Sequence, residues 1–470
     1  MPANIALVLC LAFSVYILVS ESKWRPIPSH AIWIPIIWMV LIGSRYTGQW
    51  LSLLGMSKGL SSLNLSPDAI LDGSPLDRNI FLILIISGLI VLINRKVNFG
   101  SVIRRNKAIA VFFLLCLISI LWSDFPFVAL KRWFKNFGNI VMVLVVLTDP
   151  YPMVAIKALL KRTAYILIPL SFIFIKYFSQ FGRYYSIEGI SYYCGVATDK
   201  NMLGNLLLVC GLFFLWDTYF RLMKKTFDSI WQIALYAVML LIILWQLKLA
   251  NSATSLATMS IGLIVVVIVN IPIIKRNISK LSLFIVIFLV TGYVLQMIFG
   301  ITEIMVAHLG RDMTFTTRSF LWQEVLVYPI NPLIGTGYES FWLGARRAYF
   351  WNLHWWHPIQ AHNGYIETYL NLGLIGIGML VIMLLSVYRK ISRFIANDLE
   401  FGSFRLAFFV VTLLYNMTEA SFYGLGIVWF MFLLVAIDQP FFITGEMSNG
   451  NSTETESKLG KPSIQINVLI

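Results

Sequence analysis

Long apolar runs separated by short polar stretches extend along most of the chain. A membrane-spanning helix needs about 20 mostly apolar residues, and shorter runs require extension by flanking aromatic residues or shelter by neighbouring helices. Thirteen runs are candidates for such spans: 3–19, 31–43, 79–94, 108–122, 137–148, 163–175, 202–216, 229–245, 254–271, 281–299, 366–388, 404–418 and 424–437. The pattern predicts an all-α polytopic membrane protein with about 12–13 transmembrane helices.

A long polar segment between the apolar runs and a polar C-terminal tail divide the chain into four parts. Residues 1–300 contain the first ten predicted spans, and residues 366–440 contain the last three. Between them, residues 301–365 form a large loop that carries four of the five histidines and many aromatic residues. Residues 441–470 are a polar tail, which we expect to be disordered. Any chemistry should lie in the large loop.

The large loop contains one stretch with helical spacing, TFTTRSFLWQEVLVYP. Its apolar residues recur at helical intervals, Thr316 or Thr317 can cap the first turn, and Pro329 ends the run. We therefore expect a short amphipathic helix here. Gly335 and Gly337, in the following INPLIGTGYESFW, predict a turn.

Composition agrees with a membrane protein. Hydrophobic residues make up 59% of the chain and charged residues 12%, whereas a soluble domain has roughly 45–50% apolar and about 25% charged residues. The four cysteines show neither a disulfide framework nor a metal-ligand spacing. The first 20 residues lack the basic start and small-residue cleavage site of a secretory signal, so we interpret them as a retained first span.

Lysine and arginine in the short loops predict the orientation of the spans, because basic loops stay on the cytoplasmic side. Alternation of the spans puts five basic groups on one side: Arg95/Lys96/Arg104/Arg105/Lys107, Lys157/Lys161/Arg162, Arg221/Lys224/Lys225, Lys275/Arg276/Lys280 and Arg389/Lys390/Arg393. The N-terminus and the large loop are then outside, and the C-terminal tail is inside. The net charge of +14 is spread over these loops, so it does not indicate a nucleic-acid partner.

Two groups of cations violate this rule because they fall on the outer side. WSDFPFVALKRWFKN places Lys131, Arg132 and Lys135 in an outer loop, and Lys200 follows Asp199 at the mouth of the seventh span. These side chains either reach lipid headgroups and pair with nearby aspartates, or they line a substrate path. In the second case they suit an anion that bears two phosphates.

Arg318 and the histidines of the large loop are further candidates. Arg318 either joins the anion-binding cations or pairs with Glu324 on the amphipathic helix. His354, His357 and His362 match no common zinc pattern, so we predict no metal. His362 stands at the start of a membrane helix, where it is either structural or a base that takes a proton from a hydroxyl group.

Tryptophan and tyrosine residues of the large loop, Tyr338 and Trp342 among them, have two interpretations. They form an interfacial belt at the bilayer surface, or they provide flat faces on which sugar rings stack. The sequence does not separate the two.

Five motifs occur in an order that resembles one family. They are WSDFP…LKRW, ATDKNMLGN, NSATSLAT, GRDMTFTTRSFLW…NPLIGTGYESFW and QAHNGYIETYLNLGLIG. The likeness as a whole covers about residues 70–430. This order resembles the O-antigen ligase and polysaccharide polymerase superfamily of bacterial inner-membrane proteins, in particular its exopolysaccharide-polymerisation branch.

The resemblance implies a glycosyltransferase of the C type that uses undecaprenyl-diphosphate-linked glycan at the periplasmic face, with no metal and no nucleotide sugar. His362 matches the family's proposed base for the acceptor hydroxyl, and Arg318 matches an arginine implicated with the diphosphate. Arg132 and Lys200 match further basic positions, and Arg311 is an additional diphosphate candidate. The N-terminus and the large loop would then be periplasmic.

Some assignments go beyond these basic positions. Asn363 and Tyr365, beside the candidate base, are candidate acceptor contacts, and Tyr338 and Trp342 are candidate glycan contacts. The sequence departs from the family pattern at Asp199, where a histidine is expected before the lysine, so the role of this position stays open.

Several functions remain open at this point. An exopolysaccharide or O-antigen polymerase and a ligase to lipid A core share the donor and differ in the acceptor, and a protein O-glycosyltransferase differs in the same way. A transporter or flippase would instead place ionisable residues in the middle of the membrane, whereas most charges here fall at span mouths. The family likeness also implies a flippase and a chain-length regulator as partners.

Overall fold

The computed structural model describes residues 1–21, 26–55, 73–185, 189, 191–277, 280 and 318–439. Within them the chain is almost entirely helical, as predicted, and the sole sheet is an antiparallel pair of short strands. The apolar run 281–299 and the C-terminal tail lie outside the described residues.

Each of the other twelve apolar runs contains a helix. These helices are α1 (Ala3–Glu21), α2 (Trp33–Ile42), α5 (Pro75–Asn94), α7 (Lys107–Ile118), α8 (Pro126–Leu147), α9 (Pro152–Tyr177), α11 (Lys200–Lys224), α12 (Ile230–Ala250), α13 (Ala253–Val269), α19 (Gly364–Phe394), α20 (Leu399–Tyr415) and α21 (Ile427–Ala436). Shorter elements join them: η1 (His30–Ile32), α3 (Thr47–Leu53), α6 (Phe99–Arg105), η2 (Ser119–Trp122), α10 (Ser179–Gly182), β1 (Arg183–Tyr185), β2 (Ser191–Tyr193), α14 (Pro272–Arg276), α17 (Arg318–Val327) and α18 (Gly344–Leu353).

Six of the described helices are long and apolar enough to cross a membrane alone: α1, α5, α9, α11, α12 and α19. Two bent pairs, α2 with α3 and α6 with α7, raise this number to eight if each pair is one span. Helices α13 and α21 are apolar but shorter. Most of the predicted runs therefore form helices of the bundle, while fewer than 12 meet the length and composition expected of an independent span.

Helix α8 corrects one sequence prediction. The cations of LKRWFKN were expected in an outer loop before a span at 137–148, but the helix begins at Pro126 and includes them. Proline suits the first turn because its fixed φ is helical and it needs no N–H partner there. Arg132, Lys135, Asn136 and Asn139 share the buried face of this helix.

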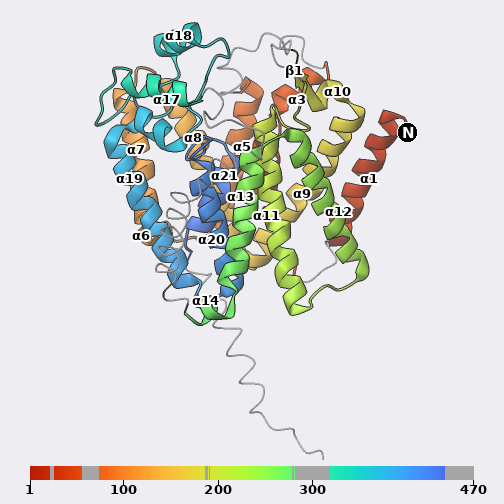
Figure 1. Cartoon of the computed structure of the whole chain (residues 1–470). Helices are drawn as coiled ribbons and strands as arrows, with labels where there is room; N and C mark the ends of the chain where they lie inside the picture. The colour runs from red at the N-terminus through yellow and green to blue at the C-terminus, as the bar shows by residue number, and fades with distance from the viewer. Residues whose placement is uncertain are drawn as a thin grey trace, which may run out of the picture.

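The elements divide between two ends of the bundle (Figure 1). Helices α10, α17 and α18 and the N-terminus lie toward one end, which we call the α17/α18 end, and α14 lies at the other. At the opposite end, residues of the basic groups that were predicted to be cytoplasmic form ion pairs. Lys157 contacts both Asp217 and Glu400, at 3.1 and 2.9 Å, and Lys224 also contacts Glu400. Lys161, expected in a loop, lies inside α9 near Asp217.

The core of the bundle surrounds α21, all ten residues of which are buried. Hydrogen bonds between buried side chains fix its neighbours, since buried polar groups need partners. The indole of Trp429 donates to Asn136 at 2.8 Å, and the indole of Trp38 donates to Asn139 at 2.9 Å. These bonds join α2, α8 and α21 directly below the α17/α18 end.

Helix α19 is broken at Gly373, where φ is 65° and ψ is −162°. The segment after Pro332 lies against this break, and its backbone bonds to the helix on both sides. Leu374 N–H donates to the carbonyl of Pro332 at 2.8 Å, and Gly337 N–H donates to the carbonyl of Asn371 at 2.8 Å. Gly337 has a positive φ of 91°, as the predicted turn requires.

We expect Gly373→Ala to destabilise the protein, because a Cβ atom there would lie 2.2 Å from the backbone carbon of Leu333. The penalty should exceed the roughly 1–2 kcal/mol of left-handed strain alone. Thermal unfolding of the purified protein in detergent measures it. Gly378→Ala, in the same helix but with open space around the added Cβ, is the matched control. Equal unfolding temperatures for the two variants would contradict the expected clash.

Candidate functional site

Two adjoining cavities lie at the α17/α18 end of the bundle. The first has a volume of about 370 Å³ and is lined by Arg132, Lys135 and Glu339, among others. The second has a volume of about 450 Å³ and is lined by His362, Glu419 and Tyr184, among others. Residues common to both linings are Asp199, Met202, Asn205, Ile359, Gln360, Ala420 and Ser421. The two cavities are therefore separated by little more than shared side chains.

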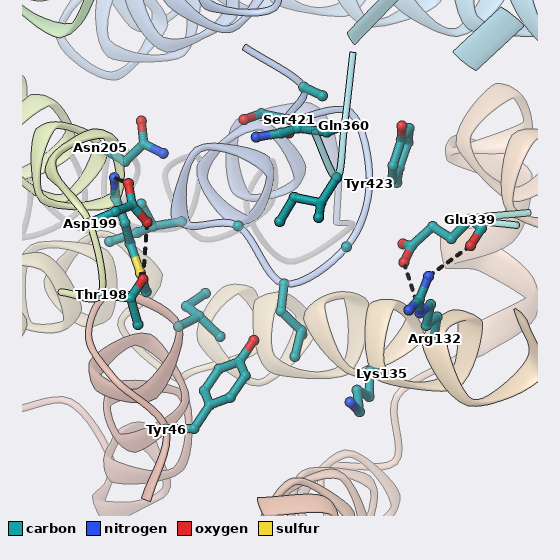
Figure 2. Close-up of a pocket in the computed structure, with 18 of the residues that line it drawn as sticks. Tyr46, Arg132, Lys135, Thr198, Asp199, Asn205, Glu339, Gln360, Ser421 and Tyr423 are labelled. Atoms are coloured by element: carbon teal, nitrogen blue, oxygen red, sulfur yellow. Dashed lines mark hydrogen bonds and ion pairs between the residues drawn. The ribbon is translucent and has the colours of Figure 1, made fainter. Parts of the chain in front are cut away.

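Two buried cations line the first cavity. Arg132 is 8% exposed and Lys135 is 9% exposed, and they are one turn apart on α8. Figure 2 shows them beside Glu339 on one side of the cavity, with Asp199 on the other. The guanidinium of Arg132 donates to the backbone carbonyl of Glu339 at 2.8 Å, and its Nε lies 3.9 Å from the Glu339 carboxylate.

These positions bear on the two interpretations of the cations that were predicted on the outer side. Arg132 and Lys135 are buried and line a cavity. Asp124, one of the proposed partners, pairs instead with Arg346 at 2.6 Å. The ammonium of Lys131 lies 4.2 Å from the ring centroid of Phe127 and is outside both linings.

Asp199 and Lys200 form the start of α11. One carboxylate oxygen of Asp199 accepts from the N–H groups of Asn201 and Met202, at 2.9 and 3.0 Å, so Asp199 is the N-cap of the helix. This gives a structural role to the position that the sequence left open. The ammonium of Lys200 lies over the ring of Tyr192 at 4.2 Å and is on the wall of neither cavity.

His362 is held by a carboxylate on the wall of the second cavity. Its Nδ1 lies 3.0 Å from one oxygen of Glu419, and Arg318 lies 2.9 Å from the other oxygen. Arg318 also donates to the carbonyl of Thr418. A carboxylate at Nδ1 selects the tautomer in which Nε2 is the acceptor, provided that the imidazole is neutral. Such an arrangement can accept a proton from a hydroxyl group.

The expected partner of Arg318 on its own helix was wrong. Glu324 pairs with His354 at 2.5 Å, and Arg318 reaches across to Glu419. Arg318 lines neither of these two cavities, and it contacts the oxygen of Glu419 that His362 does not contact.

Glu419 was missed by sequence reasoning. It lies in the short connection between the last two predicted spans and is 57 positions from His362. An acidic residue between two apolar runs on the predicted outer side was the available clue. The contact itself forms only because α19 and α20 pack together, which brings these helix ends side by side.

The surroundings of Glu419 keep its carboxyl group ionised. Burial acts to raise its pKa, but the contacts with His362 and the positive charge of Arg318 outweigh burial, so the pKa of Glu419 lies below its ordinary value of 4.5. A permanent negative charge therefore faces the imidazole at neutral pH.

The predicted glycan contacts are embedded in the protein. Tyr338 is 1% exposed, and its hydroxyl accepts from Asn136 at 2.9 Å, so it offers no ring face to a sugar. Trp342 lines the first cavity, but its indole N–H donates to both oxygens of Glu367, at 2.9 and 3.0 Å. The interpretation as stacking surfaces is therefore wrong for Tyr338.

The predicted acceptor contacts hold the start of α19. The side chain of Asn363 caps the helix by accepting from the N–H groups of Tyr365 and Ile366. The hydroxyl of Tyr365 donates to the carbonyl of Leu413 at 3.0 Å. Arg311 lies outside the described residues. In the part of the chain that is described, no group of three or more His, Cys, Asp or Glu side chains could hold a metal ion.

Comparisons with known proteins agree with the motif order. A family model described as O-antigen ligase matches residues 237–381, which include Arg318 and His362. The exopolysaccharide production protein ExoQ of Rhizobium meliloti (strain 1021) is 26% identical over 298 residues. The chain is therefore similar to proteins of the O-antigen ligase and polysaccharide polymerase superfamily. The match covers 61% of this chain and 66% of that relative.

These two similarities confirm the resemblance that the motif order predicted, and they fit the bundle of apolar helices of a multi-pass membrane protein. The family match spans α12 to the middle of α19, whereas Arg132, Lys135 and Glu419 fall outside it. The two buried cations of the first cavity and the carboxylate that contacts His362 thus come from parts of the chain that the family model does not reach.

The charge on Glu419 predicts a pH-dependent contribution to stability. A carboxyl group with a lowered pKa stabilises the folded state fully above its unfolded value of 4.5, and this stability is lost as pH falls through the folded pKa. Glu419→Gln should unfold about 2–5 °C below the wild type at pH 7, and the difference should shrink below pH 4.5. Thermal unfolding across pH measures it.

Glu324→Gln is the control for this series, because its exposed pair with His354 should add little stability. A difference for Glu419→Gln that is the same at pH 7 and pH 4 would show that charge on this carboxylate does not stabilise the fold.

Proposed function

We propose that this protein is a membrane glycosyltransferase that polymerises or transfers undecaprenyl-diphosphate-linked glycan at the periplasmic face. The observation that carries the proposal is the position of His362, which Glu419 holds on the wall of the second cavity. The first cavity, with its two buried cations, adjoins it. A base and an anion site on adjoining cavities match the two substrates of such a transfer.

The first cavity is the site for the donor's diphosphate. Guanidinium and ammonium groups are the side chains that bind phosphate oxygens most strongly, and burial strengthens their attraction for an anion. Arg132 and Lys135 supply both on one helix face. As the bond between the sugar and the diphosphate breaks, negative charge grows on the leaving group, and these cations stabilise it.

The second cavity receives the acceptor glycan. Nε2 of His362 takes the proton of the attacking hydroxyl, and the new bond forms at the anomeric carbon opposite the departing diphosphate, which inverts that carbon. Glu419 fixes the ring and stabilises the imidazolium that results. The aromatic rings of Tyr184 and Trp356 line the same cavity and suit the apolar faces of sugars.

Arg318 takes the role of a positioning residue in this scheme. Its contact with Glu419 keeps the carboxylate charged and in place behind the imidazole. Lys200 and Arg311 remain candidates for the approach of the diphosphate, outside the cavity walls. Rate comes mostly from holding two large glycans in the correct relative position, and the chemistry needs no metal.

Polymerisation is the favoured form of the reaction. The relative ExoQ is named an exopolysaccharide production protein, while the matching family model is described as O-antigen ligase. The two reactions share the donor and the base. They differ in whether the acceptor is a growing glycan on its lipid carrier or lipid A core.

The inner membrane is the proposed location, with the α17/α18 end in the periplasm. The basic groups at the opposite end support this orientation through the positive-inside rule. A membrane-impermeant maleimide applied to intact spheroplasts should label Asn352→Cys, on exposed α18, and should spare Lys225→Cys until the membrane is permeabilised. The four native cysteines are buried and give a low background. The reverse labelling pattern would overturn the orientation.

His362→Ala should reduce glycan transfer by about 10²–10⁴-fold, since general-base catalysis contributes that much. The assay uses the purified protein, a defined undecaprenyl-diphosphate oligosaccharide as donor, and either a second carrier-linked glycan or lipid A core as acceptor. The product distinguishes a polymerase from a ligase. His30→Gln, at a histidine on η1 that lines neither cavity, should keep wild-type activity. Full activity of a correctly folded His362→Ala protein would remove the proposed base.

A further inference from the structure

A carboxylate stands in the proposed diphosphate site, where a negative charge opposes the binding of an anion. Glu339 lines the first cavity together with Arg132 and Lys135. Figure 2 shows its carboxylate beside the guanidinium of Arg132. Sequence reasoning gave Glu339 no role, and the proposed reaction does not use it.

The backbone of Glu339 is fixed in an unfavourable conformation. Its φ is 45°, in the left-handed region that is unfavourable for a residue with a Cβ atom. Strain of this kind persists only where the surroundings impose it, and it concentrates at functional sites. Bonds on either side impose it here. The N–H of Tyr338 donates to Ser119 at 3.0 Å, and the N–H of Ser340 donates to Asn371 at 2.9 Å.

The backbone carbonyl and the side chain of Glu339 contact Arg132 with different strength. The carbonyl accepts from the guanidinium at 2.8 Å, a normal hydrogen bond. The carboxylate oxygen is 3.9 Å from Nε, well beyond hydrogen-bond distance. By comparison, Arg318 and Glu419 approach to 2.9 Å. The hydrogen bond from Arg132 to the carbonyl therefore does not depend on the carboxylate of Glu339.

Two buried cations one turn apart require negative charge nearby at every stage of a reaction, because an uncompensated buried charge is strongly destabilising. A bound diphosphate provides it during transfer. Between turnovers the carboxylate of Glu339 lies beside Arg132. The site also has to release a product, the free lipid diphosphate, that keeps the full charge of the leaving group.

We propose that Glu339 is an exchangeable counter-ion of the donor site: its carboxylate balances Arg132 when the site is empty, gives way to the diphosphate, and returns to help expel the lipid diphosphate product. This inference rests on the proposed function and adds a residue that sets donor and product affinity. The carboxylate makes binding of the donor and of the lipid diphosphate product weaker than the two cations alone would make it. The weaker binding of the product allows turnover.

The test measures binding of farnesyl diphosphate, a short isoprenyl diphosphate, to the purified full-length protein in nanodiscs by isothermal titration calorimetry. Glu339→Gln removes the competing charge and keeps the backbone carbonyl, so it should bind about tenfold more tightly than wild type. Glu339→Asp keeps the charge and should stay within about twofold of wild type. Arg132→Gln should bind about tenfold more weakly or worse.

Glu324→Gln is the matched control. It removes the same charge from a carboxylate on α17 that pairs with His354 and lines neither cavity, so its affinity should equal that of wild type. In the transfer assay, Glu339→Gln should also show stronger inhibition by added undecaprenyl diphosphate. The gain in affinity should disappear in the double variant with Arg132→Gln, because the two side chains act on each other.

Two kinds of failure can be told apart. If wild type binds the probe, Arg132→Gln weakens it, and Glu339→Gln leaves it unchanged or weaker, the counter-ion role is overturned while the donor site stands. If wild type and Arg132→Gln are alike in failing to bind, the proposed donor site itself is wrong.

Discussion

Backbone hydrogen bonds attach the segment after Pro332 to the helical bundle at the broken helix α19. The break at Gly373 exposes peptide groups that a continuous helix would satisfy internally, and the incoming segment pairs with them. A side chain at Gly373 or Gly335 would meet backbone atoms within about 2.5 Å, so the close approach depends on glycine. From this junction the chain runs directly to Glu339 and the first cavity.

Burial of charge organises the site once that junction is made. In an apolar interior each ionised group needs an opposite charge or several hydrogen bonds, so charges gather in groups. Glu419 bridges Arg318 and His362, and Glu339 contacts Arg132. The two groups come from different helices but line adjoining cavities. The same requirement that stabilises the fold therefore brings a histidine held by a carboxylate next to two buried cations.

Local sequence patterns predicted the structure correctly for elements whose conformation depends on residues close together in the chain. The helical spacing of TFTTRSFLWQEVLVYP produced α17, and Gly335 and Gly337 form a turn with positive φ. The pattern failed at α8, where cations were taken to mark a loop. The sequence alone does not show whether a lysine or arginine beside an apolar run lies in a loop or on the buried face of a helix that lines a cavity.

Composition and the length of apolar runs were enough to determine a helical membrane protein, because lipid requires backbone groups to be satisfied within helices. Motif order also predicted the similarity to this superfamily and put His362 ahead of the last helices. Tertiary structure alone decided that Glu419 holds His362, that Arg318 serves Glu419 and not Glu324, and that Lys135 and Glu339 share a cavity with Arg132. Those contacts join residues far apart in the chain, and only the packing of helices brings them within reach.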